Sequence, residues 1–468
     1  MDNKKQALDI YLMGIGGTGM GAFAGLLKQK GHRVSGSDIA VYSPMKEKLR
    51  EWNISYHAPY DAKNLPEKCD LVIIGNVIRK DNPEALSVMA KQVPYDSFPR
   101  ALNRLFLKDT IPIVATGTHG KTTCSALLAH TLFAAGYDPG FLIGGIPINF
   151  GESFRAPSRP KSPFVVEGDE YDTAFFDKRP KFMHYDPHYL LLTSLEFDHG
   201  DIYRDLDSVI DAFASLLKTL GPKDSLVLNA DDPNIKHALA RSQCQARSKT
   251  YGSSGDFVAA DCQYNEHGLS FTVKHGAHSL GDIVLPLFGE HNLNNALGCY
   301  AILHEYGLSH RAISDGFAKF LGTKRRLEEK CTAGGHIVVD DFAHHPSAVK
   351  ETIKAARQRY PNKRIAAIFE PRSATSCTKI FEPDYQQAFL GADLVLLAPV
   401  GRSLPEKDRL NTNVIAEAIN QQGAKAQAFD NYEDLRAELS KIPKDNVLLF
   451  MSNGDFQGLL KDVEKIFC

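Results

Sequence analysis

The sequence predicts an α/β protein of three domains, each built around a largely parallel β-sheet. Three observations support this. Short apolar segments alternate with helical stretches along most of the chain, a pattern typical of parallel βαβ units. The length of 468 residues exceeds what one hydrophobic core usually supports. Two glycine-rich turns, at residues 14–20 and 115–123, each join an apolar strand to a helix, as phosphate-binding turns do.

The first domain is predicted over residues 1–108 and has simple strand and helix alternation. Its strands are expected at 9–13, 33–37 and 70–75, and its helices at 20–30 and 44–52. The first residues match no signal-peptide pattern, and no stretch approaches the ~20 apolar residues of a membrane span. We therefore expect a cytoplasmic protein with no membrane partner.

The second domain is predicted over residues 109–322 and joins an α/β core to a small antiparallel patch. Core strands are expected at 111–116, 164–167, 190–194 and 225–229. The patch is expected from three short β-rich runs with polar turns, at 257–263, 269–274 and 283–287. Helices are expected at 292–306 and 311–320, before a boundary at Gly322-Thr323.

The third domain is predicted over residues 323–468 and returns to strand and helix alternation. Its strands are expected at 337–341, 365–369, 394–398 and 447–451. These strands are continuously apolar, as in a Rossmann-like sheet that is covered by helices on both faces.

The overall charge excludes a broadly basic surface. Lys and Arg total 54, Asp and Glu total 56, and the net charge is −2, so nothing in the composition favours nucleic acid or an anionic membrane as partner. A phosphate ligand must therefore be bound by local groups. The eight cysteines include no C-x-x-C pair, so a cysteine metal cluster is not expected.

The strongest functional motif is ATGTHGKTT at residues 115–123. Backbone N–H groups of such a loop surround a phosphate at a helix N-terminus. Lys121 can reach the β- and γ-phosphates, and the Thr122 hydroxyl can bind Mg²⁺. The general phosphate-loop pattern has a glycine where this chain has Ala115, so the loop is a variant. We predict ATP as its ligand.

Acidic residues and a histidine follow two later strands of the same domain. Glu167 ends the strand at 164–167, where a second ligand for the nucleotide's Mg²⁺ belongs. Asp169, Glu170 and Asp172 come next and are more typical of a solvated turn or helix cap. His199 follows the strand at 190–194 and is flanked by acids, which makes a second metal site plausible.

The first glycine-rich turn, GIGGTGM at 14–20, is followed by Asp38 at the end of the next strand. This spacing is typical of dinucleotide binding, with the acid accepting from a ribose or base edge. Three interpretations remain open: a nicotinamide or flavin site, another nucleoside diphosphate site, or a tight turn. The second phosphate loop favours the nucleoside diphosphate, because a chain with two phosphate sites more often joins two phosphorylated ligands.

Further motifs lie in the second and third domains. Asn292 can cap a helix, pair with an adenine edge, or do both, whereas the segment at 229–233 is more typical of a cap. The basic run at 324–326 is either a solvated face or a source of an arginine that reaches a phosphate when domains close. Acidic, histidine and arginine residues end neighbouring strands at 340–346 and 369–373.

Together these motifs resemble the Mur ligase family, ATP-dependent amide-bond-forming enzymes of bacterial cell-wall synthesis. The resemblance covers nearly the whole chain and includes the shortened phosphate loop. It rests on the motifs at residues 14–20, 116–123, 167, 196–199, 291–295, 325–326 and 340–346.

The resemblance implies that a carboxylate attacks the γ-phosphorus of ATP and that an amine then attacks the acyl phosphate. The turn at 14–20 resembles the branch that uses UDP-N-acetylmuramate. The acceptor is either L-alanine or the tripeptide L-alanyl-γ-D-glutamyl-meso-diaminopimelate, and the segments at 144–150, 169–182 and 369–373 favour the tripeptide. Two hypotheses from other classes are a Rossmann oxidoreductase with an accessory nucleotide site and a nucleotide-gated binding module.

The resemblance also implies a role for each site residue. ATP would contact Gly117, Thr118, His119, Gly120, Lys121, Thr122, Thr123, Asn292, Arg326 and Asp341. The UDP-sugar would contact Gly16, Gly17, Thr18, Gly19, Met20, Asp38 and Asn76. Two Mg²⁺ ions would be held by Thr122, Glu167 and His199. Catalytic roles fall to Lys121, Glu167, His199, Arg326 and His344, with His345 as the alternative to His344. The peptide would contact Arg372 and Ser373. No lysine matches the family's carbamylated lysine, and the oligomeric state is not predicted.

Overall fold

The computed structural model describes residues 7–333 and 335–467, which form two compact units. The first unit contains the chain up to residue 195 together with residues 210–257 and 298–316. The second contains residues 196–209, 258–297 and the chain from 317 onward. Within the described residues, no helix has both the length and the apolar character that a membrane span needs.

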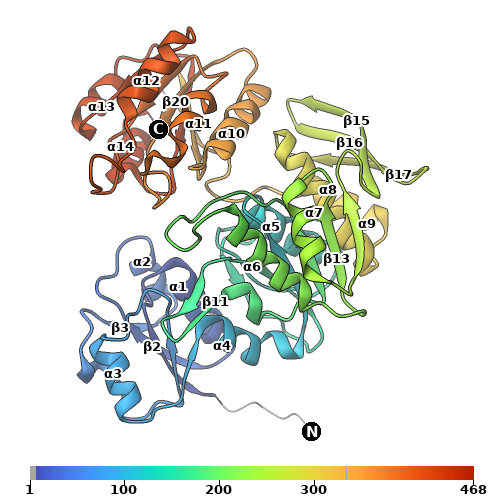
Figure 1. Cartoon of the computed structure of the whole chain (residues 1–468), viewed down its shortest axis with the longest axis vertical. Helices are drawn as coiled ribbons and strands as arrows, with labels where there is room; N and C mark the ends of the chain where they lie inside the picture. Colours follow the sequence, from blue (N-terminus) through green and yellow to red (C-terminus); the bar gives the residue numbers. More distant parts are fainter. Residues whose placement is uncertain (1–6, 334, 468) are drawn as a thin grey trace. The chain divides into compact units, whose positions relative to one another are not determined.

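The first sheet of the first unit is wholly parallel, with strand order β3-β2-β1-β4-β5. Its strands are β1 (Asp9–Met13), β2 (Arg33–Ser37), β3 (Ser55–His57), β4 (Leu71–Ile74) and β5 (Tyr95–Ser97). Its helices are α1 (Thr18–Gln29), α2 (Met45–Glu51), α3 (Pro83–Ala90) and α4 (Phe98–Leu105), with 3₁₀ turns η1 (Ala62–Asn64) and η2 (Leu107–Asp109). The predicted bounds of β1 and β2 are confirmed. This region is blue in Figure 1.

The second sheet of this unit carries the phosphate loop. Its order is β14-β13-β12-β6-β9-β7-β8, parallel except for the β7 and β8 pair. The strands are β6 (Ile111–Thr116), β7 (Gly140–Leu142), β8 (Phe154–Arg155), β9 (Pro163–Gly168), β12 (Tyr189–Leu192), β13 (Ser225–Asn229) and β14 (Arg247–Tyr251). The helices are α5 (Lys121–Ala134), α6 (Leu206–Lys218), α7 (Pro233–Ser242), α8 (Glu290–Tyr306) and α9 (His310–Ala318), with the 3₁₀ turn η3 (Lys181–His184).

A hairpin that the sequence did not predict links this sheet to the first. It consists of β10 (Asp172–Ala174) and β11 (Asp177–Pro180), which pair antiparallel. Phe175 and Phe176 at its tip pack against a buried cluster that includes Tyr11, Val72 and Ile74 of the first sheet. The hairpin therefore ties the segment after β9 to the N-terminal sheet.

The antiparallel patch is present, as predicted, with longer strands. It consists of β15 (Phe257–Asn265), β16 (Gly268–His275) and β17 (His278–Leu285). β17 begins well before the predicted residue 283, because a tight turn at Gly276 (φ +58°) brings His278 opposite His275. The predicted run at 283–287 overlaps only the last three residues of this strand, 283–285.

The C-terminal sheet has the order β18-β19-β23-β20-β21-β22. The strands are β18 (Glu328–Ala333), β19 (His336–Asp341), β20 (Arg364–Phe369), β21 (Leu394–Leu397), β22 (Lys425–Ala428) and β23 (Asn446–Met451). The helices are α10 (Pro346–Arg359), α11 (Glu382–Ala388), α12 (Thr412–Gln421), α13 (Tyr432–Leu439) and α14 (Leu459–Phe467), with the 3₁₀ turns η4 (Lys379–Phe381) and η5 (Phe456–Gly458). Only β18 is antiparallel to its neighbour. It is an edge strand whose EEKCTA sequence gives no apolar signal.

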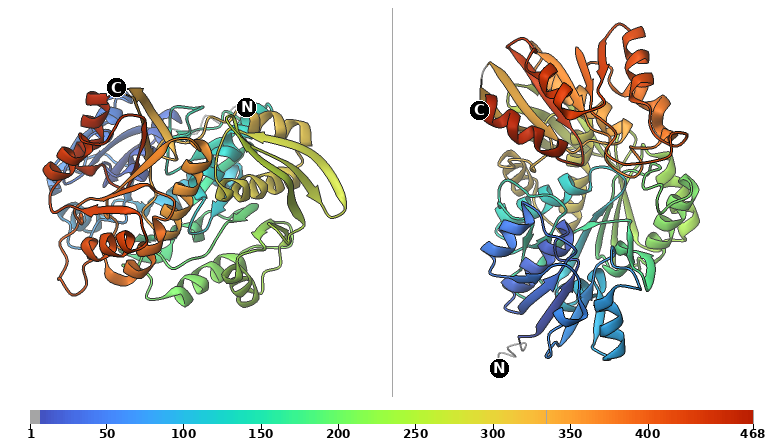
Figure 2. Two further views of the ribbon diagram at one scale, coloured as in Figure 1. Left: turned by 90° about the horizontal axis from the view of Figure 1, so that it is seen from above. Right: turned by 90° about the vertical axis from the view of Figure 1, so that its left-hand side faces the viewer.

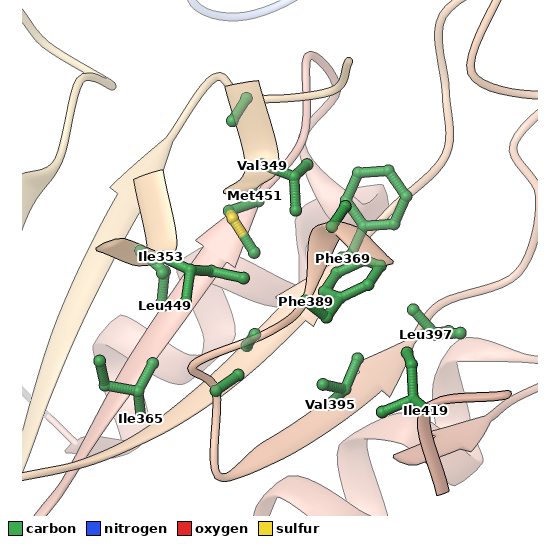
Figure 3. Packing of buried hydrophobic residues seen from close by; sticks show 14 of the residues in the cluster. Val349, Ile353, Ile365, Phe369, Phe389, Val395, Leu397, Ile419, Leu449 and Met451 are labelled. Atoms are coloured by element: carbon green, nitrogen blue, oxygen red, sulfur yellow. The ribbon is translucent and has the colours of Figure 1, made fainter. Parts of the chain in front are cut away.

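Helices cover both faces of this sheet, in orange and red in Figures 1 and 2. Successive side chains of a strand point to opposite faces, so Phe369 and Leu449 face one layer while Ile368 and Leu448 face the other. The first layer contains residues of α10, α11 and α12, and the second contains residues of α13 and α14. Figure 3 shows the first layer, with Phe369 beside Phe389.

Phe369→Ala tests how much this layer contributes to the stability of the fold. Phe369 is 1% exposed and its ring lies 5.2 Å from that of Tyr385 and 5.5 Å from that of Phe389. Removing it is expected to lower the free energy of unfolding by about 3–5 kcal/mol, as measured by urea denaturation. Leu390→Ala is the control, because Leu390 is 52% exposed and should change stability by less than about 0.5 kcal/mol. Equal effects of the two substitutions would contradict the assignment of Phe369 to the core.

Candidate active site

The phosphate loop lies where β6 meets α5, and its glycines have a geometric reason. Gly117 has φ +129° and Gly120 has φ +83°, a region that side chains disfavour. A Cβ at Gly117 would also lie 2.3 Å from Thr193 Oγ1. Since Lys121 and Thr122 open α5 directly after this turn, the N–H groups at the start of the helix border the loop. The strand, loop and helix context predicted for ATP is therefore present.

Lys121 is bound within its own loop. Its Nζ donates to Gly117 O at 2.6 Å and to Thr118 O at 3.2 Å, and it forms an ion pair with Glu170 Oε1 at 2.9 Å. Burial lowers the pKa of Lys121, but the neighbouring carboxylates of Glu170 and Asp169 outweigh this, and the pKa is raised overall. Lys121 therefore remains a cation. Glu170 was not among the predicted site residues, yet its side chain is 3% exposed and pairs with the central lysine.

Thr122 and Glu167 lie side by side, as expected for two ligands of one ion. Thr122 Oγ1 donates to Glu167 Oε1 at 2.9 Å, while Glu167 Oε2 accepts from the Gly144 N–H at 2.7 Å. A Cβ at Gly144 would lie 2.9 Å from Oε2, so this close approach needs a glycine. A hydroxyl and a carboxylate at the end of the phosphate loop are oxygen ligands of the kind that Mg²⁺ prefers. The residues present therefore fit the ion.

Two other acids of this segment, Asp169 and Asp172, form ion pairs with lysines. Asp169 accepts from Lys181 Nζ at 2.6 Å, and Lys178 pairs with Asp172 at 2.6 Å. Burial raises the pKa of Asp169, but the charge of Lys181 outweighs it and lowers the pKa overall. These acids are ion-paired, so the expectation of a merely solvated turn is wrong for Asp169 and Glu170.

Asp38 joins the first glycine-rich turn to the end of β2. Its Oδ2 accepts from the Gly16 N–H at 2.8 Å, and its Oδ1 accepts from Ile39 N–H at 2.7 Å and from the Tyr60 hydroxyl at 3.2 Å. The structure brings Asp38 and the turn together, as predicted. Met20 is 8% exposed in the first turn of α1, so its side chain belongs to the core. The predicted residues Gly17, Thr18, Gly19 and Asn76 follow β1 and β4 in the same sheet.

Sequence analysis missed Glu84, a fully buried acid near this turn. Its carboxylate accepts from the hydroxyls of Ser37 and Tyr11, from the Asp61 N–H at 3.2 Å and from Asn64 Nδ2 at 2.9 Å. Glu84 thus fixes the residue before Asp38 and the turn that follows Tyr60. The sequence gives no signal for this, because an acid in the first turn of α3 is typical of an ordinary surface helix.

In the second unit, His199 lies in a strained turn. It has φ +57°, which is uncommon for a residue other than glycine. Its N–H donates to Asp198 Oδ1 at 2.6 Å. Burial raises the pKa of Asp198, but nearby histidines, His199 first and then His344, outweigh it and hold the pKa at about 2. Asp198 is therefore an anion beside the predicted histidines.

His344 and His345 have different surroundings in the same unit. The His344 Nδ1 donates to Phe342 O at 3.0 Å, since a carbonyl can only accept, and this leaves Nε2 as an acceptor. Burial lowers the pKa of His344 to about 4, so its ring is neutral at pH 7. His345 Nε2 lies 3.3 Å from Phe197 O, and Nδ1 lies 3.5 Å from Glu196 Oε2.

Asp341 and Asn292 make local hydrogen bonds. Asp341 accepts from the N–H groups of Leu327 at 2.6 Å and Ala343 at 2.8 Å. Asn292 lies inside the first turn of α8 and donates to Phe288 O at 2.7 Å, so it is not the residue that caps this helix. The cap expected at 229–233 is Asp232, which accepts from the first N–H groups of α7.

The two arginines of the basic run, Arg325 and Arg326, have different surroundings. Arg325 Nη2 donates to Ser452 O and Gly454 O, both at 2.6 Å, and its Nε lies 3.2 Å from Asp340 Oδ2. Arg326 lies over the Phe342 ring, 5.0 Å from its centroid. Arg325 therefore supports the C-terminal sheet, and Arg326 contacts the aromatic ring of the same segment.

Asp340 should make stability depend on pH. Burial raises its pKa from 3.8 to about 6, although Arg325 lowers it. Between these values the folded protein holds a proton that the unfolded chain has released, so this residue's contribution falls as the pH rises from about 4 to about 7. Asp340→Asn removes that proton. Between pH 4 and pH 7 the unfolding free energy of the wild type should therefore fall by about 2–3 kcal/mol more than that of the variant. Urea denaturation at a series of pH values measures both. Parallel pH profiles would contradict it.

Arg372 and Ser373 follow β20, as predicted. The Arg372 N–H donates to Ser376 Oγ at 3.1 Å, and Ser373 Oγ bonds with Ser376 at 2.8–2.9 Å. Ser373 therefore helps to fix the turn after Arg372. The structure thus groups Lys121, Thr122 and Glu167 in the first unit, and Asp198, His199 and His344 in the second.

Three family models match the chain in order. The Mur ligase family catalytic domain matches residues 9–110, the Mur ligase middle domain matches 115–303, and the Mur ligase glutamate ligase domain matches 325–454. The chain belongs to the Mur ligase family. It has the three-domain α/β fold of this family and is an ATP-dependent amide-bond-forming ligase whose middle domain binds ATP. The predicted family, fold class and type of enzyme are confirmed.

Relatives of this Mur ligase match over nearly their full length. It is 36% identical to UDP-N-acetylmuramate–L-alanyl-γ-D-glutamyl-meso-2,6-diaminoheptandioate ligase of Escherichia coli, over 96% of each chain. It is 31% identical to UDP-N-acetylmuramate–L-alanine ligase of Clostridium acetobutylicum, over 95% of each chain. Among solved structures, a murein peptide ligase of Psychrobacter arcticus aligns with a TM-score of 0.75 and 30% identity over 98% of both chains.

Proposed function

We propose that this Mur ligase joins the lactyl carboxylate of UDP-N-acetylmuramate to the amine of L-alanyl-γ-D-glutamyl-meso-diaminopimelate, in peptidoglycan recycling in the bacterial cytoplasm. The supporting observation is the order of identities. Two ligases named for the tripeptide are 36% identical to this chain, whereas ligases named for L-alanine are 30–34% identical. We also propose the division of labour expected from the sequence: UDP-sugar at 1–108, ATP at 109–322 and peptide at 323–468.

In the first step, the muramate carboxylate attacks the γ-phosphorus of ATP, which forms an acyl phosphate and releases ADP. The main barrier is the repulsion between two anions, so cationic groups must neutralise the transferring phosphoryl group. Lys121, which pairs with Glu170, supplies one charge. Thr122 and Glu167 would hold Mg²⁺, which would supply further charge neutralisation, and His199 would hold an ion that does the same for the carboxylate. We also propose that Arg326 binds the phosphates.

In the second step, the peptide amine attacks the acyl phosphate and releases phosphate. His344 is suited to assist the amine, because its ring is neutral at pH 7 and its Nε2 is left as an acceptor. Arg372 is suited to bind a peptide carboxylate through its two parallel N–H donors. Asn292 holds adenine and Asp341 the ribose in this proposal.

Phosphate release with UDP-N-acetylmuramate and ATP tests the function. With the tripeptide as acceptor, kcat/KM is expected to exceed that with L-alanine by at least about 100-fold, the equivalent of about 3 kcal/mol. The reverse order would make the chain an L-alanine ligase instead. Phosphate release without any dependence on an acceptor would contradict both assignments.

A further inference from the structure

The side chain of Arg372 lies against two glycines from different loops. A Cβ at Gly454, after β23, would lie 2.6 Å from Arg372 Cδ and 3.1 Å from its Cγ. A Cβ at Gly401, after β21, would lie 3.1 Å from the same Cδ and 3.4 Å from Nη1. The two glycines therefore border a slot that holds the stem of the arginine.

Neither glycine is required by the backbone. Gly391 and Gly423, in neighbouring loops, have φ +99° and +90°, where a side chain would be strained. Gly401 and Gly454 are not among the residues with positive φ, so alanine could adopt their conformations. A side chain there would instead meet Arg372, together with Glu370 Oε2 at Gly454 and Pro371 O at Gly401.

A buried carboxylate shares this slot. Glu370 is 0% exposed, and the same Cβ at Gly454 would lie 2.6 Å from its Oε2. Glu370 accepts from the Tyr432 hydroxyl at 2.5 Å, from Ser452 Oγ at 2.5 Å and from Phe456 N–H at 3.2 Å. It therefore fixes both ends of the loop that contains Gly454.

Arg325 also holds the loop at 452–456, and one side-chain oxygen of this loop has no hydrogen-bond partner among the described residues. Arg325 donates to the carbonyls of Ser452 and Gly454, and the Gly454 N–H donates to Ser452 Oγ at 2.8 Å. Asn453, in the middle of the loop, has a buried Oδ1 without a hydrogen-bond partner among the described residues. Buried polar atoms are rarely left unpaired, so this oxygen can accept from a donor outside the loop.

We propose that Gly401 and Gly454 form a slot that directs the Arg372 guanidinium toward a carboxylate of the acceptor peptide remote from its reacting amine, with Glu370 and Tyr432 as positioning residues. This deepens the function proposed above and rests on it. L-Alanine has one carboxylate, adjacent to its amine, whereas the tripeptide has carboxylates several bonds farther along. A guanidinium held in one position therefore selects the acceptor whose carboxylate extends to it, which is the longer one. Asn453 accepts from an amide or amine of the same peptide.

Gly454→Ala is the first test, measured by phosphate release in the full-length protein. The added methyl displaces the stem of Arg372, so KM for the tripeptide is expected to rise at least about tenfold while KM for ATP and for UDP-N-acetylmuramate stays unchanged. Gly401→Ala should have a smaller effect of the same kind, because its closest contact is longer. Gly221→Ala is the matched control, since its Cβ would meet nothing closer than 3.6 Å.

A double-mutant cycle separates this role from general damage. In an Arg372→Ala background, which should itself raise the tripeptide KM, Gly454→Ala is expected to raise that KM by a smaller factor than it does in the wild type, because only the contact with Glu370 remains. Tyr432→Phe, which removes only the hydroxyl that donates to Glu370, should raise it about threefold and provides a test if Gly454→Ala does not fold.

The outcomes distinguish this inference from the proposed function. Additive effects in the cycle, or an unchanged tripeptide KM in both Gly454→Ala and Tyr432→Phe, would overturn the slot while leaving the ligase assignment intact. A wild-type protein that does not use the tripeptide would overturn the function first.

Discussion

Lys121→Ala is expected to lower the rate of phosphate release by at least about 1,000-fold, equivalent to about 4 kcal/mol of transition-state stabilisation. Lys121 is the loop's cation, and its raised pKa keeps it charged at neutral pH. Without it, the γ-phosphoryl group loses a positive charge at the point where two anions meet. Phosphate release with saturating ATP, UDP-N-acetylmuramate and tripeptide measures the effect.

Two further variants make this prediction specific. Lys121→Ala leaves the buried Glu170 without its partner, which destabilises the fold on its own account, so the double variant Lys121→Ala/Glu170→Ala should be equally inactive and more stable. Lys178→Ala is the control, because Lys178 is 69% exposed and pairs with Asp172. Near-normal turnover in the double variant would remove Lys121 from the catalytic residues.

Glu167→Gln is expected to raise the Mg²⁺ concentration needed for half-maximal activity by about 10- to 100-fold, the usual cost of weakening a metal site. The amide keeps the shape of the side chain but lacks the charge, and its NH₂ group cannot accept from Gly144 as Oε2 does. Phosphate release titrated with Mg²⁺ measures the shift.

Asp172→Asn provides the comparison for Glu167→Gln. It neutralises another acid of the same segment, one that pairs with an exposed lysine, and should leave the Mg²⁺ titration unchanged. If the two variants respond alike to Mg²⁺, the ion is not held by Glu167.

The framework of the fold could be read from the sequence because its central strands are buried on both faces. β1, β2, β6 and β13 have the predicted bounds. β1, β6 and β13 are short, mostly apolar runs between clear turns, whereas β2 (RVSGS) has a single apolar side chain. The hairpin of β10 and β11 escaped prediction because EYDTAFFDKRP mixes charged and aromatic residues, and its order comes from packing against another sheet. β18 was also not predicted. As an edge strand it pairs with one neighbour only, and its sequence EEKCTA has no apolar run.

The candidate site could be predicted where its parts follow adjacent parallel strands. Lys121, Thr122 and Glu167 lie at the ends of adjacent parallel strands, so their proximity follows from topology. Glu170 could not be ranked above its acidic neighbours, because only the fold shows that it, unlike Asp172, pairs with Lys121. The same holds for Glu370, whose partners Tyr432 and Ser452 are 62 and 82 residues away in the sequence.

The hairpin at 172–180 has a consequence for the inheritance and exchange of domains. The hairpin follows β9, the strand that contains Glu167, and its two phenylalanines pack against the N-terminal cluster. Residues 9–110 therefore do not form a self-contained module: part of their surface is completed by a strand pair encoded more than sixty residues downstream. A chimera that takes its N-terminal domain from another Mur ligase must take the hairpin from the same parent.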